Sequence, residues 1–263
     1  MAGLAATLGS GAMTNSMQET MKSDVILVTG TNTTWCHPVF GGMVRKAVKE
    51  KGVKLIVVDP REIDLARIAD IHVRQKGGSD VAWLMGVQKI IIDNNWHKKE
   101  YIDTRCEGWD EYLKSLESFT PEFVSEVSGI SVEDLTAIAK LYATGGRAAI
   151  FYAMGITQHS HGVDNVKAVS NLALITGNLG VEGGGVPVRG ASGMSSMNGR
   201  SGGSDECEEQ PGRGKNRREP GRRGGGHEHV QGGVHHAGAA SFTAQAGGAG
   251  AHHQREAHDQ ARA

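Results

Sequence analysis

The sequence predicts an α/β domain built on a doubly wound, mainly parallel sheet, followed by a C-terminal tail without a fold. Short apolar runs at 25–29, 54–58 and 148–152 have the length and composition of strands that are buried on both faces. Helical patterns follow the first and the third run, and this alternation is typical of parallel sheets covered by helices. After residue 190 the composition changes, because large apolar side chains become scarce.

The composition argues against several classes of protein. The 28 basic residues nearly balance the 29 acidic residues, so no overall field favours binding to nucleic acid. Cys36, Cys106 and Cys207 are far apart, so we expect neither a disulfide framework nor an iron–sulfur or zinc site in this chain. No apolar run is long enough to span a membrane, and the first residues lack the basic region of a signal peptide. A cytoplasmic location is the default expectation.

Three segments are expected along the chain. Residues 1–23 form a lead-in of small, Gly-rich residues, for which we expect a tight loop; a frayed N-terminal tail is the alternative. Residues 24–190 form the α/β domain. Residues 191–263 contain no Leu, Ile, Trp or Tyr, so they cannot bury enough apolar surface to offset the entropy of ordering, and we expect disorder.

The first predicted strand, 25–29, ends in a polar turn, GTNTT at 30–34. A helix is expected from about Val39 to a stop at Gly52, and the second strand then ends in Asp59. A strand, a loop, a helix, a strand and a terminal acid make a Rossmann-like unit, in which the acid can bind a ribose or a base. Because the GxGxxG fingerprint is absent, the pattern argues against plain NAD binding, and the unit could also be scaffold alone.

A third strand is predicted at 71–74, followed by the Gly-rich turn KGGSD. Ser79 is expected to cap the helix that begins near Asp80. Capping and compensation of the helix dipole would explain both residues without any ligand.

A helical stretch without expected chemistry comes next. Its segments are predicted at 98–105, 109–117 and 121–127. Ser131 begins a capping box that opens a further helix, which runs to about Tyr142. The many charges of this stretch are expected on a solvated outer face.

The last predicted strand, 148–152, leads to Gly155, where the backbone can turn sharply or approach a ligand closely. A polar cluster follows, consisting of Thr157, Gln158, His159 and His161. An amphipathic helix is then expected from Gly162 to a stop at Gly177. Its apolar stripe contains Val163, Val166, Val169, Leu172 and Ala173. Such a loop is where α/β proteins place anionic or nucleotide ligands, although an ordinary connection would look the same.

Five stretches resemble, in their order along the chain, the molybdopterin oxidoreductase family and within it the formate dehydrogenases. They are AGLAATLGSGAMTNS, TGTNTTWCHP, VDPR, KGGSD, and AMGITQH with TGNLG. The resemblance covers about residues 2–190, and none is seen after Gly190. It implies a bis-molybdopterin guanine dinucleotide cofactor with molybdenum or tungsten, and oxidation of formate to carbon dioxide. It also implies a 4Fe–4S cluster in a longer parent protein, which would pass electrons to electron-transfer subunits.

The resemblance also implies the residues that hold the cofactor. The polar turn after the first strand would meet the pyrophosphate, the acids Asp59 and Asp80 would meet the ribose and the guanine, and the last loop would lie towards the pterin. The expected set is Gly30, Thr31, Asn32, Thr33, Thr34, Asp59, Pro60, Arg61, Gly78, Ser79, Asp80, Met154, Gly155 and Gln158. Because each segment follows a predicted strand, we expect all of them around one cleft at the carboxyl edge of the sheet.

Arg189 is the expected catalytic residue, because the resemblance places here an arginine that holds the formate carboxylate. Arg189 and Gly190 match the family's run and the residues after them do not, so a surface arginine is the alternative. The family's metal-ligating residue and its four-cysteine cluster are not recognised in this chain, so we expect a fragment that is inactive alone. Another superfamily member, such as a nitrate reductase, and a non-catalytic nucleotide-binding module are the alternative functions.

Overall fold

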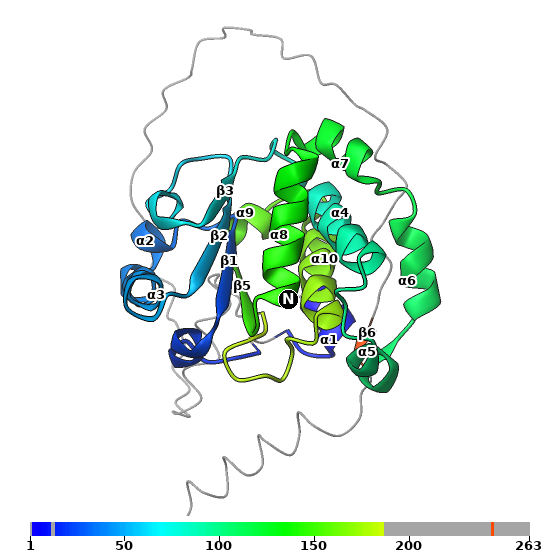
Figure 1. The fold of residues 1–263 in the computed structure, drawn as a ribbon, viewed down its shortest axis with the longest axis horizontal. Helices are drawn as coiled ribbons and strands as arrows, with labels where there is room; N and C mark the ends of the chain where they lie inside the picture. Colours follow the sequence, from blue (N-terminus) through cyan, green and yellow to red (C-terminus); the bar gives the residue numbers. More distant parts are fainter. Residues whose placement is uncertain (1, 12–13, 187–242, 245–263) are drawn as a thin grey trace, which may run out of the picture.

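The computed structural model describes residues 2–11, 14–186 and 243–244, and Figure 1 shows their arrangement. A four-stranded sheet lies at the centre, with helices packed against both of its faces. The predicted α/β fold class is therefore confirmed. The predicted tail at 191–263 lies outside the described residues except for β6 (Thr243–Ala244), which pairs antiparallel with β4 (Cys106–Glu107).

The strands of the central sheet are β1 (Val25–Thr29), β2 (Lys54–Val58), β3 (Ile71–Val73) and β5 (Ala148–Tyr152). Their spatial order is β3-β2-β1-β5, and all neighbouring pairs are parallel. Strands β1 and β5 are buried along their whole length, as expected for strands covered on both faces. The strands predicted at 25–29, 54–58 and 148–152 are confirmed, and β3 ends at Val73 rather than Arg74.

Alternate residues of each strand divide between two cores. Ile26 and Val28 of β1 pack with α3 (Pro38–Lys51) on one face of the sheet. On the other face, Val25 and Leu27 belong to a larger core with α4 (Asp80–Asp93), α8 (Val132–Thr144) and α10 (Gly162–Ile175). Figure 1 shows α3 on the opposite side of the sheet from these three helices. Both layers are therefore present, as a doubly wound sheet requires.

Helix α10 is buried more completely than its amphipathic pattern predicts. Most of the predicted stripe is buried, but Val163 is exposed, while the polar residues Asn165, Ser170 and Asn171 are buried. The reason is that both α1 (Ala2–Leu8) and α4 pack against α10. The buried polar groups find local partners: the Asn165 amide donates to the Ile156 carbonyl oxygen (2.8 Å).

The lead-in begins with a helix, α1, where a tight loop was expected. Its residues, AGLAATL, are rich in Ala and Leu, which favour helices, and Leu4 is fully buried in the main core. Gly3 allows the close approach to α10, because a Cβ atom there would lie 2.8 Å from the Val163 carbonyl oxygen and from Val166. The loop prediction was wrong here because docking on another helix stabilises a short helix that would be marginal alone.

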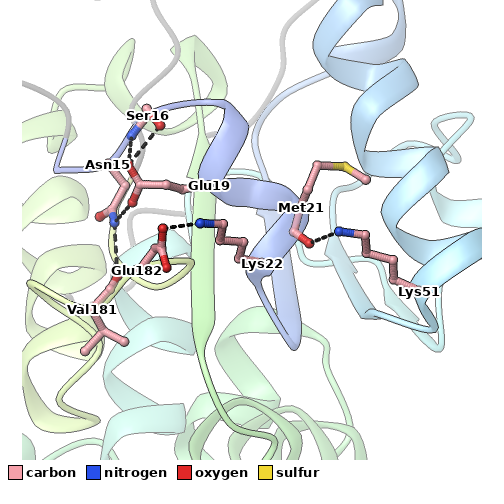
Figure 2. Close-up of polar contacts among 8 residues, drawn as sticks. All are labelled: Asn15, Ser16, Glu19, Met21, Lys22, Lys51, Val181 and Glu182. Atoms are coloured by element: carbon pink, nitrogen blue, oxygen red, sulfur yellow. Dashed lines mark hydrogen bonds and ion pairs between the residues drawn. The ribbon is translucent and has the colours of Figure 1, made fainter.

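Figure 2 shows the hydrogen bonds and the ion pair that join the rest of the lead-in to the segment after α10. The Asn15 amide donates to the Val181 carbonyl oxygen (3.1 Å). Lys22, at the end of the 3-10 helix η1 (Gln18–Lys22), forms an ion pair with Glu182. Two segments that are far apart in the sequence therefore lie side by side below the sheet's amino-terminal edge.

The helices predicted between β3 and β5 are confirmed, with small shifts at their ends. They are α5 (Lys99–Arg105), α6 (Trp109–Leu116), α7 (Pro121–Ser128) and α8. Ser131 Oγ accepts a hydrogen bond from the Asp134 N–H (3.0 Å), which confirms the predicted cap. The cap predicted at Ser79 is wrong: its hydroxyl donates instead to the Lys76 carbonyl oxygen (2.7 Å), although α4 begins at Asp80 as predicted.

Candidate functional site

The loops that follow the four parallel strands meet in one cleft of about 720 Å³. From β1 the chain continues to β2 and β3 on one side, whereas β5 lies on the other side, so the strand order reverses between β1 and β5. Open α/β sheets bind ligands at such a point, outside the carboxyl ends of the strands. The lining residues are Gly30, Thr31, Asn32, Trp35, Cys36, His37, Asp59, Pro60, Arg61, Gln75, Gly77, Gly78, Asp80, Ala153, Met154, Gly155 and His159.

The structure brings together all four segments that the sequence placed around one cleft. Four members of the expected set do not line it, namely Thr33, Thr34, Ser79 and Gln158. Arg189 lies outside the described residues. The continuous described segment before it ends at Val186. The described chain reaches the outer edge of β5 just before that point, where Gly185 bridges to Ala149.

Two glycines form the junction between the turns after β1 and β5. The Gly155 N–H donates to the Gly30 carbonyl oxygen (3.0 Å), and a Cβ atom at Gly155 would lie 2.6 Å from that oxygen. Gly30 has a φ of 57°, in the left-handed region that favours glycine. The backbones can approach this closely only because neither residue has a side chain, so backbone atoms line the cleft at the strand reversal.

The turn after β1 carries polar atoms without partners. It leads into the short helix α2 (Thr33–Cys36). Buried side-chain oxygens of Asn32, Thr33 and Thr34 make no hydrogen bond within the part of the chain that the structure describes. Buried polar atoms normally have partners, and of these three residues Asn32 lines the cleft, so its side-chain oxygen could accept a hydrogen bond from a polar ligand there.

Asp59 directly follows β2 and is only 2% exposed. Its Oδ1 atom accepts a hydrogen bond from the Arg61 backbone N–H (2.9 Å), which shapes the turn. The Arg61 Nε atom lies 3.7 Å from the same oxygen, and the Arg61 side chain is largely exposed. An acid at the end of the second strand suits a ribose hydroxyl, and an exposed guanidinium beside it suits an anion.

Asp80, the first residue of α4, is a buried acid, 4% exposed. Burial raises the pKa of its carboxyl above the ordinary value, while Gln75, His159 and Trp83 act in the opposite direction. Gln75 Nε2 donates to Oδ1 (3.4 Å), and His159 Nε2 lies 3.8 Å from Oδ2. These partners do not compensate for burial, so the carboxylate would gain from further donors on a ligand in the cleft.

The turn after β5 contains a short helix that the sequence did not predict, α9 (Met154–Thr157). Met154 is 45% exposed and lines the cleft, whereas Ile156 is buried in the main core. The Gln158 N–H donates to the Met154 carbonyl oxygen (2.8 Å) and closes the helix. Met154 is therefore the side chain of α9 that lines the cleft.

Some lining residues were missing from the expected set. Trp35 is 77% exposed, which is unusual for a large aromatic side chain, and an indole inside a polar turn was the available signal. Gln75 follows β3 closely, so the strand-end rule that selected Asp59 could have selected it too. His159 was noticed only as a member of a polar cluster; its nearness to Asp80 is a long-range contact that the sequence does not reveal.

The described residues contain neither a cluster of metal-ligating side chains nor a helix suited to a membrane. Within residues 2–11, 14–186 and 243–244, no three His, Cys, Asp or Glu side chains are grouped so that they could hold a metal ion. No helix in the same part of the chain has the length and apolar character that crossing a membrane requires. The two cysteines described there, Cys36 and Cys106, are free thiols.

Comparisons with known proteins agree with one another. The family model described as "Molybdopterin oxidoreductase" matches residues 4–257, beyond Gly190, where the resemblance was expected to end. The chain is 42% identical over 191 residues to formate dehydrogenase H of Escherichia coli. This alignment covers 72% of this chain and 27% of that protein. It is 43% identical over 189 residues to the F420-dependent formate dehydrogenase subunit alpha of Methanocaldococcus jannaschii, covering 72% of this chain and 28% of the relative.

Among solved structures, acetylene hydratase from Pelobacter acetylenicus has a similar fold. The TM-score is 0.64 at 26% sequence identity, and the match covers 71% of this chain and 25% of that one. The chain thus spans about a quarter of the length of the proteins that it matches.

Proposed function

Because this chain belongs to the molybdopterin oxidoreductase family and is related to formate dehydrogenases, we propose that it supplies part of the cofactor site of a formate dehydrogenase. The proposed cofactor is bis-molybdopterin guanine dinucleotide with molybdenum or tungsten, and this chain would hold one guanine dinucleotide half. The observation that carries the proposal is the single cleft to which the turns after all four strands contribute. The activity itself would belong to a longer protein, since the chain spans 27% of formate dehydrogenase H.

The residues present fit the polar parts of such a ligand. The turn 30–34 offers backbone N–H groups and the side chains of Thr31 and Asn32, which line the cleft, to a pyrophosphate. Asp59 would accept a hydrogen bond from a ribose hydroxyl. Asp80 would accept two hydrogen bonds from the adjacent N–H donors of a guanine edge, which would offset the cost of burying its charge.

Met154, which lines the cleft, would lie towards the pterin, and Gln158, which the resemblance adds to it, follows just outside the lining. When bound, the metal centre supplies the acceptor for the electrons that leave formate as carbon dioxide forms. Arg189, outside the described residues, would hold the formate carboxylate through charge-assisted hydrogen bonds. The electrons would then pass to a 4Fe–4S cluster and to electron-transfer subunits of the longer protein.

One observation supports a second candidate. The match to acetylene hydratase shows that this fold occurs in a protein named for a different reaction, so the cleft could serve another superfamily enzyme, such as a nitrate reductase. A non-catalytic nucleotide-binding module would use the same cleft without a metal. A formate dehydrogenase and another superfamily enzyme would both bind the guanine of the cofactor in this cleft. Guanine binding is therefore the first property to test.

GDP is a probe for that end. The purified chain should bind GDP in preference to ADP, and Asp80→Ala should remove the preference, since two hydrogen bonds to a charged group are lost, each contributing about 1.5–3 kcal/mol. Calorimetric titration measures both affinities. Asp93→Ala is the matched control, because Asp93 lies in the same helix but is exposed and pairs with Lys89 (2.6 Å). Equal affinity of the wild-type chain for GDP and ADP would contradict the proposal.

A further inference from the structure

His159 connects two parts of the cleft. Its Nε2 atom lies 2.8 Å from the Gly155 carbonyl oxygen and 3.8 Å from Asp80 Oδ2. The imidazole therefore joins the turn after β5 to the first turn of α4. It lines the cleft itself and is partly exposed there, so a ligand could contact the network that it forms.

The contact with Gly155 shows which ring nitrogen carries a proton. A carbonyl oxygen can only accept, so His159 Nε2 must be the donor in this hydrogen bond. The ring therefore carries a polar hydrogen on the nitrogen that faces Asp80, even when the imidazole is neutral. That hydrogen is directed at Gly155, so at 3.8 Å the N–H group acts on Asp80 as a nearby partial positive charge, which favours the ionised carboxylate, and not as a hydrogen-bond donor.

Gln75 completes the arrangement around Asp80. Its Nε2 atom donates to Oδ1 (3.4 Å), so each carboxylate oxygen has one protein N–H group nearby. An ionised carboxylate can accept about four hydrogen bonds. Gln75 and His159 thus restrain the carboxylate from its two sides, and both oxygens retain acceptor capacity for a ligand that presents two parallel donors.

The same network extends to the strand reversal. Gly155, which accepts from His159, also donates its N–H to the Gly30 carbonyl oxygen (3.0 Å). Asp80, His159, Gly155 and Gly30 therefore form a continuous chain of contacts from the first turn of α4 to the turn after β1.

We propose that His159 is a positioning residue for base recognition: it orients the Asp80 carboxylate and couples that acid to the junction of the β1 and β5 turns. The proposal rests on the proposed function, because it takes Asp80 as the acid that recognises guanine. His159 acts through Asp80 and makes no base contact of its own. Removing it should therefore affect guanine nucleotides selectively, whereas a general loss of structure would affect all nucleotides alike.

The experiment compares GDP and ADP binding to the full 263-residue chain by calorimetric titration. We expect His159→Ala to weaken GDP binding about tenfold, because the Asp80 carboxylate loses the positive partial charge on its Oδ2 side, and to leave ADP binding unchanged. His159→Gln, which keeps an N–H donor, should recover most of the GDP affinity. His161→Gln is the matched control, because His161 belongs to the same loop but does not line the cleft.

The outcomes separate the two proposals. If the wild-type chain prefers GDP but His159→Ala binds it as tightly, or loses GDP and ADP equally, the role of His159 is overturned and the guanine site stands. A His159→Gln variant as weak as His159→Ala also overturns it. No preference for GDP in the wild-type chain contradicts the proposed function, and the role of His159 with it. Should His159→Ala fail to fold by circular dichroism, His159→Leu removes the N–H group while keeping the side-chain bulk.

Discussion

Asp80 shows, at the scale of one residue, how a buried acid that lines a cleft can lower the stability of the protein that carries it. The acid is nearly fully buried, and burial raises its pKa although Gln75 and His159 partly counter this effect. A carboxyl whose pKa is raised by folding lowers the free energy of unfolding when it ionises. Its position at the start of α4 is favourable for a charge, but the helix dipole is worth only about 0.3–1 kcal/mol at an exposed site.

We predict that Asp80→Asn stabilises the chain at neutral pH. Because the folded-state pKa is raised above 3.8, the folded protein binds more protons than the unfolded protein between these two values, and wild-type stability falls as the pH rises through that interval. Asparagine cannot ionise, so the variant avoids this loss. Urea denaturation should show a stability difference that grows above about pH 4. Asp93→Asn, which alters an exposed and paired acid, should show no such gain; an Asp80→Asn chain that is less stable than wild type at neutral pH would refute the prediction.

At the scale of elements, the junction between the β1 and β5 turns decides where the cleft lies. The strands are adjacent and parallel, and their turns touch through Gly30 and Gly155. The atoms nearest to a Cβ at Gly155 are backbone atoms of Gly30, at 2.6 to 2.9 Å. Backbone cannot move aside as a flexible side chain can, so any side chain here must separate the two turns.

We predict that Gly155→Ala costs about 1–3 kcal/mol of unfolding free energy, the usual range for an overpacked site, and weakens GDP binding. Gly42→Ala is the control, because Gly42 lies in α3 with open space around its Cβ position. That substitution should raise stability by about 0.5–1 kcal/mol through helix propensity. Chemical denaturation of both variants measures the difference, and an unchanged Gly155→Ala chain would show that the turns can separate freely.

At the scale of the whole molecule, the chain combines a well-packed domain with a cleft that we propose holds part of a cofactor. The described core is continuous on both faces of the sheet, and the lead-in helix α1 belongs to it through Leu4. The cleft opens at one edge of the sheet. The region of similarity covers only 27–28% of the relatives, so most of what surrounds the corresponding site in a formate dehydrogenase lies outside it.

We predict that the purified chain binds GDP but does not catalyse formate-dependent reduction of a redox dye. The reason is that it would supply nucleotide-binding and pterin-facing residues without the residue that ligates the metal or the cysteines of an iron–sulfur cluster. A spectrophotometric assay with formate and a viologen dye checks this, with metal and pterin analysis of the same sample. Turnover by the chain alone, above a sample heated until it unfolds, would contradict the prediction.

Much of the architecture could be predicted because its signals are local. The runs 25–29, 54–58 and 148–152 are strands because continuous apolar residues must be covered on both faces, and the stop at Gly52 follows from its left-handed backbone. The cleft could be placed because the polar turns directly follow parallel strands. The family membership was likewise readable in five ordered motifs.

Other features depend on which elements pack together, and no local pattern contains that information. The lead-in is helical because α10 covers its apolar side, and α10 is buried beyond its stripe because α1 and α4 both pack on it. Ser79 lies at the predicted cap position, yet its hydroxyl bonds to Lys76 because the turn curls back on itself. The approach of His159 to Asp80, and of Gly155 to Gly30, joins residues far apart in the sequence. Apolar periodicity determines what each segment becomes; long-range packing determines which side chains meet, and therefore which chemistry the cleft can perform.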